Sequence, residues 1–229
     1  MELNADFSRR VSVHGAGAAW MPSPIPGVDR RMFDRIGDEV ARATSIVRYA
    51  PGSAFSPHVH TGGEEFLVLE GVFQDEHGDF PAGTYVRNPP TSRHTPASEN
   101  GCTIFVKLWQ FDPDDRTQVR IETSDAVFSR EPQRPGIEFV ALFEDSRENV
   151  SLKRWPAGSR VDLASPGGLE VLVLEGNFVE SGETFRPQSW LRLPCDTATG
   201  VTVGAAGALV WIKRDHLREM PAAPQIRSA

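Results

Sequence analysis

Residues 65–73 read Glu-Phe-Leu-Val-Leu-Glu-Gly-Val-Phe, and residues 170–178 read Glu-Val-Leu-Val-Leu-Glu-Gly-Asn-Phe, so the two stretches are offset by 105 residues. Further matches at this offset are Phe80 with Phe185, Tyr85 with Trp190, Arg87 with Arg192 and Pro89 with Pro194. Similarity at a fixed separation indicates that one folding unit occurs twice. The chain therefore contains two copies of one fold.

Each copy has the pattern of short β-strands, in which apolar, β-branched and aromatic runs are bounded by Gly, Pro and Asp. The strands predicted for the first copy cover residues 41–49, 65–69, 84–87 and 103–111, and those for the second cover 137–143, 150–155, 169–174, 189–193 and 208–213. Residues 75–79, Asp-Glu-His-Gly-Asp, predict a hairpin turn, because Asp and Gly favour turn conformations. We expect an all-β protein built from two tandem barrels.

Composition narrows the class of protein. The 229 residues include 20 Gly and 18 Pro, which argues against a helical bundle. The net charge of −7 argues against a nucleic-acid or anionic-membrane partner, because phosphates require a surplus of positive charge. Cys102 and Cys195 are too few for a disulfide framework, so we expect free thiols. The N-terminus does not resemble a signal peptide, and a cytoplasmic location is expected.

The repeat sets the expected domain boundaries. We place the first domain over residues 1–112, a polar linker over 113–134 and the second domain over 135–229. The prolines at positions 22, 24 and 26 exclude a helix near the N-terminus, where an extended arm is expected.

The first copy carries a pattern with metal-binding chemistry. Gly52, His58, His60, Glu64 and Gly71 form Gly-x5-His-x-His-x3-Glu-x6-Gly. Histidines at i and i+2 of a strand point to the same face. The turn that follows, Thr-Gly-Gly, allows the chain to double back and bring the carboxylate towards both imidazoles.

A second pattern follows, Gly83-x5-Pro89-x-Thr91-x2-His94, and supplies a third imidazole. Three nitrogens and one carboxylate oxygen inside a barrel suit a divalent transition metal, with Zn, Fe, Mn and Ni as the candidates. The sequence thus predicts one metal site formed by His58, His60, Glu64 and His94, and it assigns no catalytic residue.

Taken together, the two patterns resemble the two motifs of the cupin superfamily, and residues 75–90 resemble the ChrR-like cupins, named after the cupin half of a zinc-containing anti-sigma factor. The resemblance implies two jelly-roll (double-stranded β-helix) barrels. Thr91 and Ser98 replace the usual Gly and Asn of the second motif, which affects turn geometry rather than ligation. The sigma-binding helical domain of the anti-sigma factor has no counterpart before residue 40, so a sigma factor is not expected as partner.

The second copy lacks most of these ligands. The repeat register places Ala164 and Pro166 at the positions of His58 and His60, and Thr199 at that of His94, and leaves only Glu170. We expect a metal-free second barrel with a structural, dimerising or ligand-gating role.

Other polar residues have simpler interpretations. Glu65 is expected to face solvent or to substitute as a ligand, and Arg87 to form an ion pair within the barrel wall. His14, His77 and His216 are expected on the surface.

Two functions remain open, with a third, weaker one. The resemblance favours a regulatory or sensory protein that responds to an oxidant or small ligand. The isolated metal site favours a metal-dependent dioxygenase acting on a small oxygenated substrate, such as a β-diketone or a catechol-like compound. An isomerase of a sugar or metabolite is the weaker alternative. A small-molecule ligand or substrate is the expected partner, and a homodimer is expected by resemblance alone.

Overall fold

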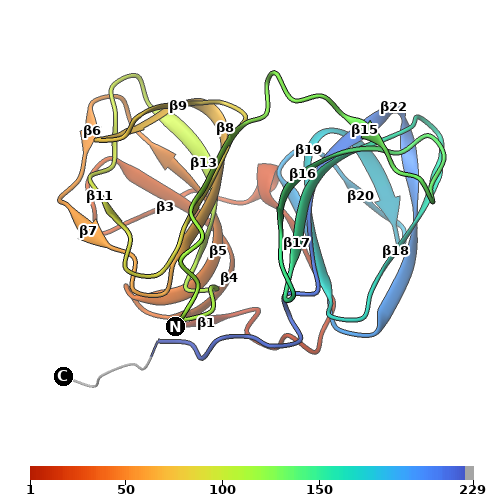
Figure 1. Cartoon of the computed structure of the whole chain (residues 1–229), viewed down its shortest axis with the longest axis horizontal. Coiled ribbons are helices and arrows are strands. Elements are labelled where there is room, and N and C mark those ends of the chain that lie inside the picture. The colour runs from red at the N-terminus through yellow and green to blue at the C-terminus, as the bar shows by residue number, and fades with distance from the viewer. Residues whose placement is uncertain (225–229) are drawn as a thin grey trace. The chain divides into compact units, whose positions relative to one another are not determined.

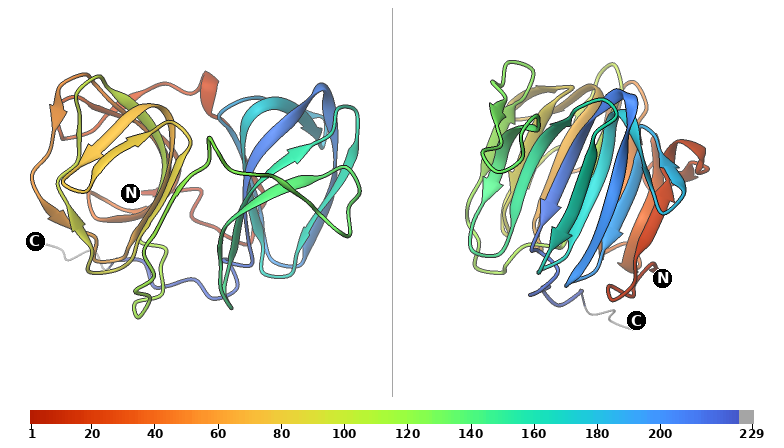
Figure 2. Two further views of the ribbon diagram at one scale, coloured as in Figure 1. Left: turned by 45° about the horizontal axis from the view of Figure 1, so that its top comes forward. Right: turned by 90° about the vertical axis from the view of Figure 1, so that its right-hand side faces the viewer.

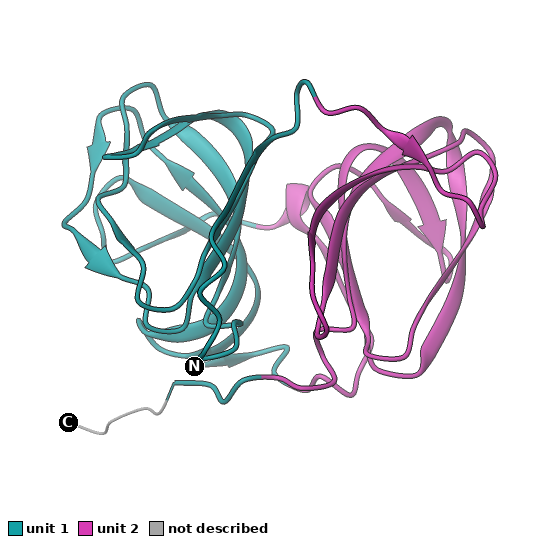
Figure 3. Ribbon diagram, in the orientation of Figure 1, with its two compact units in different colours: residues 1–5, 19–125, 221–229 teal, residues 6–18, 126–220 magenta. Residues whose placement is uncertain are grey.

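The computed structural model describes residues 1–224, and within them the chain is all-β apart from the 3-10 turn η1 (Gly15–Gly17) (Figure 1). It divides into two compact units (Figure 3). The first comprises Met1–Ala5, Ala19–Asp125 and the described residues after Met220, and the second comprises Asp6–Ala18 and Ala126–Met220. No helix among the described residues is long and apolar enough to cross a membrane.

The first unit is a barrel whose main sheet has the order β1-β4-β5-β13-β8-β10-β14, and β11 and β7 form a separate two-stranded sheet. Its strands are β1 (Glu2–Leu3), β3 (Met21–Pro22), β4 (Val28–Gly37), β5 (Ala41–Tyr49), β6 (Ser53–Ala54), β7 (His58–Val59), β8 (Glu64–Asp75), β9 (Gly78–Pro81), β10 (Thr84–Asn88), β11 (Arg93–His94), β12 (Ala97–Ser98), β13 (Cys102–Leu108) and β14 (Val119–Glu122). Alternate residues of the central strands form its apolar core, among them Val47, Phe66, Val68, Ile104 and Val106.

The second unit repeats this arrangement with the sheet order β15-β16-β17-β22-β19-β21-β2. Its strands are β2 (Val11–His14), β15 (Ser129–Arg130), β16 (Glu138–Glu144), β17 (Asn149–Trp155), β18 (Arg160–Ser165), β19 (Leu169–Glu180), β20 (Glu183–Phe185), β21 (Ser189–Leu193) and β22 (Thr197–Arg214). Its core includes Trp155, Val171, Leu191, Val210 and Ile212. The all-β, two-barrel fold is confirmed.

The N-terminal arm differs from the expected boundary. We assigned residues 1–112 to one domain, but Asp6–Ala18 belongs to the second unit. There β2 pairs with β21 and forms the edge of the sheet, as the red strand in the right-hand view of Figure 2 shows. The Arg10 guanidinium binds the carboxylates of Glu180 and Glu183, which attaches the arm to this unit. Local sequence does not reveal a strand pairing over such a separation.

The segment expected as a linker also contains strands. Within 113–134, β14 pairs with β10 of the first unit and β15 pairs with β16 of the second. Both strands are short, and β14 alternates between half-buried and exposed residues, so the apolar pattern is weak. The last five residues of the second expected domain, 225–229, lie outside the described part.

Both units share a buried charged row on the sheet face opposite the apolar core. Glu65 lies directly across from Arg87 on β10 and from Lys107 on β13. In the second unit Glu170 lies across from Arg192 and Lys213 in the same way. None of these six side chains is more than 2% exposed. The repeated Glu, Arg and Lys therefore belong to the scaffold.

Candidate metal centre

The paired strands β7 and β11 bring three histidines of the first unit together. His58 lies opposite His94 in the strand register, and the chain after β7 places His60 beside both. The ring centroids are 4.6–5.0 Å apart, and one nitrogen from each ring lies within 4.8 Å of the others. Atoms that share one ion at about 2.0–2.2 Å are at most about 4.4 Å apart, so the cluster lies within a few tenths of an ångström of this limit.

Glu64, the first residue of β8, faces the same point. Its Oε2 lies 3.4 Å from Nε2 of His60 and 3.6 Å from Nε2 of His94. Asn88, directly across on β10, donates its Nδ2–H to the same oxygen at 3.2 Å. The structure therefore places the carboxylate beside two of the three imidazoles.

Two glycines allow the chain to return from His60 to Glu64. A Cβ on Gly62 would lie 2.3 Å from the Trp109 ring, and one on Gly63 would lie 2.4 Å from the Phe111 ring. Gly63 also has φ +77°, which side chains other than glycine rarely adopt. The double-glycine turn is therefore required by packing as well as by backbone conformation.

The buried nitrogens of this cluster fit a metal ion. Nε2 of His60 and Nε2 of His94 are both buried and have no hydrogen-bond partner. Buried polar atoms usually have a hydrogen-bond partner. Two buried nitrogens that lack a partner and face the same carboxylate therefore indicate a position for a bound ion. Imidazole and carboxylate are also the donor types that divalent transition metals prefer.

Hydrogen bonds on the far side of two rings select the ligating tautomer. Nδ1–H of His94 donates to Oδ2 of Asp75 at 3.1 Å, and Nδ1–H of His58 donates to the carbonyl oxygen of Ser56 at 3.3 Å. Each arrangement leaves the Nε2 lone pair free for a metal. Carboxylate–histidine–metal contacts of this kind orient a ligand and raise its basicity.

The pKa values differ between the two buried histidines. Burial lowers the pKa of His60, against the opposing charge of Glu64, so this ring is neutral and able to ligate near neutral pH. Burial also lowers the pKa of His94, but the hydrogen bond to Asp75 and the negative charges of Glu64, Asp75 and Glu76 together outweigh it, and the net shift is upward. Asp75 and the metal position thus act on opposite nitrogens of the His94 ring.

Sequence reasoning missed Asp75 and Asn88, which form hydrogen bonds with His94 and Glu64 of the candidate site. Asp75 was assigned only to the hairpin turn, where its Oδ1 does accept the backbone N–H of His77 at 2.7 Å. The sequence pattern did not indicate Asn88, because its contact depends on which residue of β8 lies opposite it. Knowledge of the strand register was the missing information.

A pocket of about 330 Å³ opens beside the cluster. His58, His60 and Glu64 form part of its wall, and Tyr49, Phe55, Ile104, Val106 and Leu108 contribute much of the apolar remainder. Burial, with a further contribution from the charge of Glu64, raises the pKa of Tyr49 well above its ordinary value, so the phenol is protonated near neutral pH. A small molecule in this pocket would therefore meet apolar walls and the metal-facing groups together.

Residues 8–112 match the family described as the ChrR cupin-like domain. This part of the chain therefore belongs to the cupin superfamily. The cupin fold extends over both units, because solved bicupin structures align with nearly the whole chain.

Three solved structures illustrate this similarity. A candidate dioxygenase from Nostoc punctiforme is 14% identical, with a TM-score of 0.75, and the alignment covers 97% of this chain and 88% of that chain. The pirin from Escherichia coli in complex with nickel(II) is 13% identical, with a TM-score of 0.64 and coverage of 90% and 99%. The oxalate decarboxylase variant of B. subtilis is 11% identical, with a TM-score of 0.56 and coverage of 89% and 76%. No curated protein shows significant sequence similarity to the chain.

The second unit differs from the prediction at one position. We expected Glu170 to correspond to Glu64, but the strand register equates Glu170 with Glu65, on the opposite face of the sheet. The counterpart of Glu64 is Leu169, which lies across from Leu193 as Glu64 lies across from Asn88, and which belongs to the apolar core. Among the described residues, the histidine cluster of the first unit is the only group of three or more suitable metal-binding side chains.

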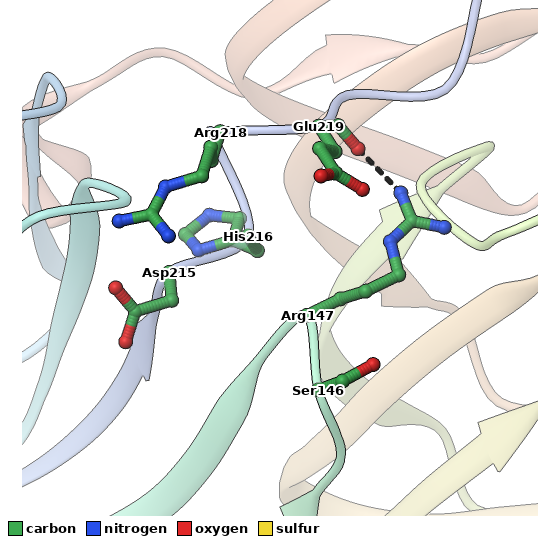
Figure 4. A pocket seen from close by; sticks show the side chains of 6 residues that line it. All are labelled: Ser146, Arg147, Asp215, His216, Arg218 and Glu219. Carbon is green, nitrogen blue, oxygen red and sulfur yellow. Dashed lines mark hydrogen bonds between the residues drawn. The ribbon is translucent and has the colours of Figure 1, made fainter.

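Two further expectations were wrong. Glu65 is only 2% exposed rather than solvent-facing, and its carboxylate accepts the Tyr85 hydroxyl at 2.7 Å on the face away from the histidines. His216 is buried rather than exposed, and its Nε2 lies 2.9 Å from Oε1 of Glu170. His216 also lines a pocket of about 60 Å³ with Asp215 and Arg218 (Figure 4). His14 and His77 are exposed, as expected.

Proposed function

We propose that the first unit binds one divalent transition metal through His58, His60, Glu64 and His94, and that the protein is a metal-dependent dioxygenase for a small oxygenated substrate. The observation that carries this proposal is the pocket of about 330 Å³ whose wall includes three of the four proposed ligands. Purely structural metal sites are closed, whereas catalytic sites keep a position open. A substrate in this pocket would have direct access to the ion.

The residues of this chain have distinct roles in the proposal. The four ligands fix the ion, and Asp75 holds the His94 ring in the ligating tautomer. A bound ion would act as a Lewis acid and, if redox-active, would provide the centre for oxygen chemistry. The apolar wall favours a substrate with a hydrocarbon body, and two neighbouring oxygens on it would suit an ion with two open positions.

Tyr49 is the proposed positioning residue. Its phenol is protonated near neutral pH, so it can donate a hydrogen bond to a substrate oxygen within the pocket. A β-diketone or a catechol-like compound has the required pair of oxygens. The nickel-containing pirin and the candidate dioxygenase among the structural neighbours are consistent with this chemistry.

Ligand sensing is the second candidate, and the match to the ChrR cupin-like domain family supports it. Both functions need the metal and the pocket. They differ in whether the bound molecule is consumed.

Elemental analysis of protein purified without added metal, followed by oxygen-uptake assays on β-diketones and catechols, tests the proposal. We expect one equivalent of iron, manganese or nickel, with turnover that His60→Ala abolishes together with metal binding. His14→Ala, which removes an exposed histidine of the second unit, is the matched control and should retain both. Stoichiometric zinc without oxygen uptake would refute the enzyme and leave ligand sensing.

A further inference from the structure

A second pocket, of about 410 Å³, lies within the second unit. Strands β16, β17 and β22 supply its walls, and residues 131–133 cover one side. The lining side chains of β17 and β22 lie on the same strand faces as the core residues Trp155 and Ile212. The pocket therefore occupies the barrel interior beyond the apolar core. It is separate from the histidine cluster, which belongs to the first unit.

The repeat shows how this pocket differs from the one in the first unit. Lys153 lies across from Val210, as Val47 lies across from Ile104. Likewise, Arg214 lies across from Asn149 as Leu108 lies across from Ala43. Val47 and Leu108 line the pocket of the first unit, and Lys153 and Arg214 line that of the second. At these two wall positions, the second pocket thus has a cationic side chain where the first has an apolar one.

The Arg214 guanidinium lacks partners on one edge. Its Nε and Nη2 are both buried and have no hydrogen-bond partner. These two nitrogens form the edge of the guanidinium that pairs with two oxygens of one carboxylate or phosphate. The hydroxyl of Ser151, in a residue that is only 2% exposed, also lines the pocket and lacks a partner.

The acidic residues around the pocket do not supply this partner. Glu131 binds Lys153 through Oε1 at 3.0 Å. The Asp215 carboxylate accepts hydrogen bonds from Ser165 Oγ at 2.8 Å and from the backbone N–H of Gly167 at 2.9 Å, both to Oδ1. Glu144 is exposed at the pocket rim.

Burial lowers the pKa of both cations, and the positive charge of Arg214 contributes to the lowering at Lys153. The buried Lys153 and the half-buried Arg214 therefore repel each other next to the cavity. An anion between them would relieve this repulsion.

We propose that the second unit is a binding site for a small organic anion, with Arg214 and Lys153 as its charged contacts. The ligand carries a carboxylate or phosphate group that pairs with Nε and Nη2 of Arg214 and accepts a hydrogen bond from the Ser151 hydroxyl. Its body packs on Phe139, whose ring centroid lies 5.9 Å from Nζ of Lys153. The buried and unpartnered Oε2 of Glu131 would accept a hydrogen bond from a donor on the ligand.

Isothermal titration calorimetry with benzoate, phenyl phosphate, inorganic phosphate and neutral benzamide tests this site. We expect the protein to bind at least one of the organic anions and to bind benzamide more than tenfold more weakly. Benzoate alone would identify a carboxylate ligand, phenyl phosphate alone a phosphate monoester, and inorganic phosphate alone a free oxoanion. Either of the first two results supports the site for an organic anion, whereas binding of inorganic phosphate alone would overturn it.

Arg214→Leu and Lys153→Val introduce the residues that the first unit carries at the same positions. Each should weaken anion binding by more than tenfold. Arg214→Lys, which keeps the charge but loses the paired edge, should also weaken it. Arg186→Gln, at an exposed arginine of the same unit, should bind as the unmodified protein does.

Metal content of the first unit serves as the independent readout. It should be the same in all these variants, so loss of anion binding with intact metal binding assigns the effect to the second pocket. If Arg214→Leu fails to fold, anion binding by Arg214→Lys is the deciding measurement. Absence of binding to every anion, equal binding of benzamide, or unchanged affinity in both Arg214 variants would each overturn the proposal.

Discussion

Asp75→Asn should weaken metal binding without changing any proposed ligand. In the folded protein the Asp75 carboxylate accepts Nδ1–H of His94 at 3.1 Å, and its side chain is only 4% exposed. An asparagine of the same shape has no charge, and its amide can donate to Nδ1 instead. The His94 ring would then carry its proton on Nε2, the atom that faces the metal position.

The expected size of this effect follows from the behaviour of such contacts. Removing the hydrogen-bond partner of a metal-bound histidine typically costs 10–100-fold in metal affinity. That range equals about 1.4–2.7 kcal/mol. We expect the upper half of the range, because the contact is buried and the partner is charged.

The assay is competition for the metal with a chromophoric chelator, measured for the unmodified protein and for two variants. Asp79→Asn is the matched control, because Asp79 belongs to the same hairpin and its Oδ1 accepts a hydrogen bond from Nε2 of Gln74 at 2.8 Å. The control should keep its metal affinity. If Asp75→Asn binds metal as tightly as the unmodified protein, or if both variants lose affinity equally, the proposed role of Asp75 is refuted.

Three further predictions concern backbone conformation and the N-terminal arm. Gly63→Ala should lower the free energy of unfolding by about 2–4 kcal/mol and reduce metal occupancy, because the added Cβ meets an aromatic ring at a positive φ; denaturant unfolding and metal analysis measure both effects. Thr91→Gly should raise the melting temperature, since Thr91 has φ +77° and glycine removes roughly 1 kcal/mol of strain; an unchanged or lower value would contradict it. Arg10→Gln should destabilise the second unit by about 1–2 kcal/mol near neutral pH. Burial raises the pKa of Glu180, but hydrogen bonds from Arg10 and others outweigh this and the net pKa is below the ordinary 4.5, so the difference between the two proteins should shrink as pH falls below that value; urea unfolding at several pH values tests this.

Local pattern was sufficient for strands that are buried along most or all of their length. The expected strands 41–49 and 189–193 coincide with β5 and β21. β4 was missed, because charged residues at positions 29–31, 34 and 35 interrupt its apolar pattern. Although Asp34 and Arg35 are buried, propensity and hydropathy describe charged residues as exposed.

The candidate site was accessible to sequence reasoning because its spacing is local. His58 and His60 lie on one short segment, and Glu64 follows after a turn that glycine makes possible. Asp75 and Asn88 were not accessible, since they reach the site only through strand pairing. The positions of the proposed ligands were thus readable from spacing, whereas the groups that orient them depend on tertiary structure.

The internal repeat reflects residues of the shared barrel scaffold rather than the side chains that face the two pockets. Its most visible carboxylates, Glu65 and Glu170, occupy the buried charged row on the face away from both pockets. The interior positions, by contrast, changed together: Glu64 corresponds to Leu169, and the apolar Leu108 corresponds to Arg214. A one-residue shift in a strand exchanges the two faces, so the matching of Glu170 to Glu64 equated a wall residue with an interior one. With the correct register, the second barrel has lost the carboxylate that faces the histidines in the first and has gained cations near its own pocket, which is why we expect the two units to bind ligands of different charge.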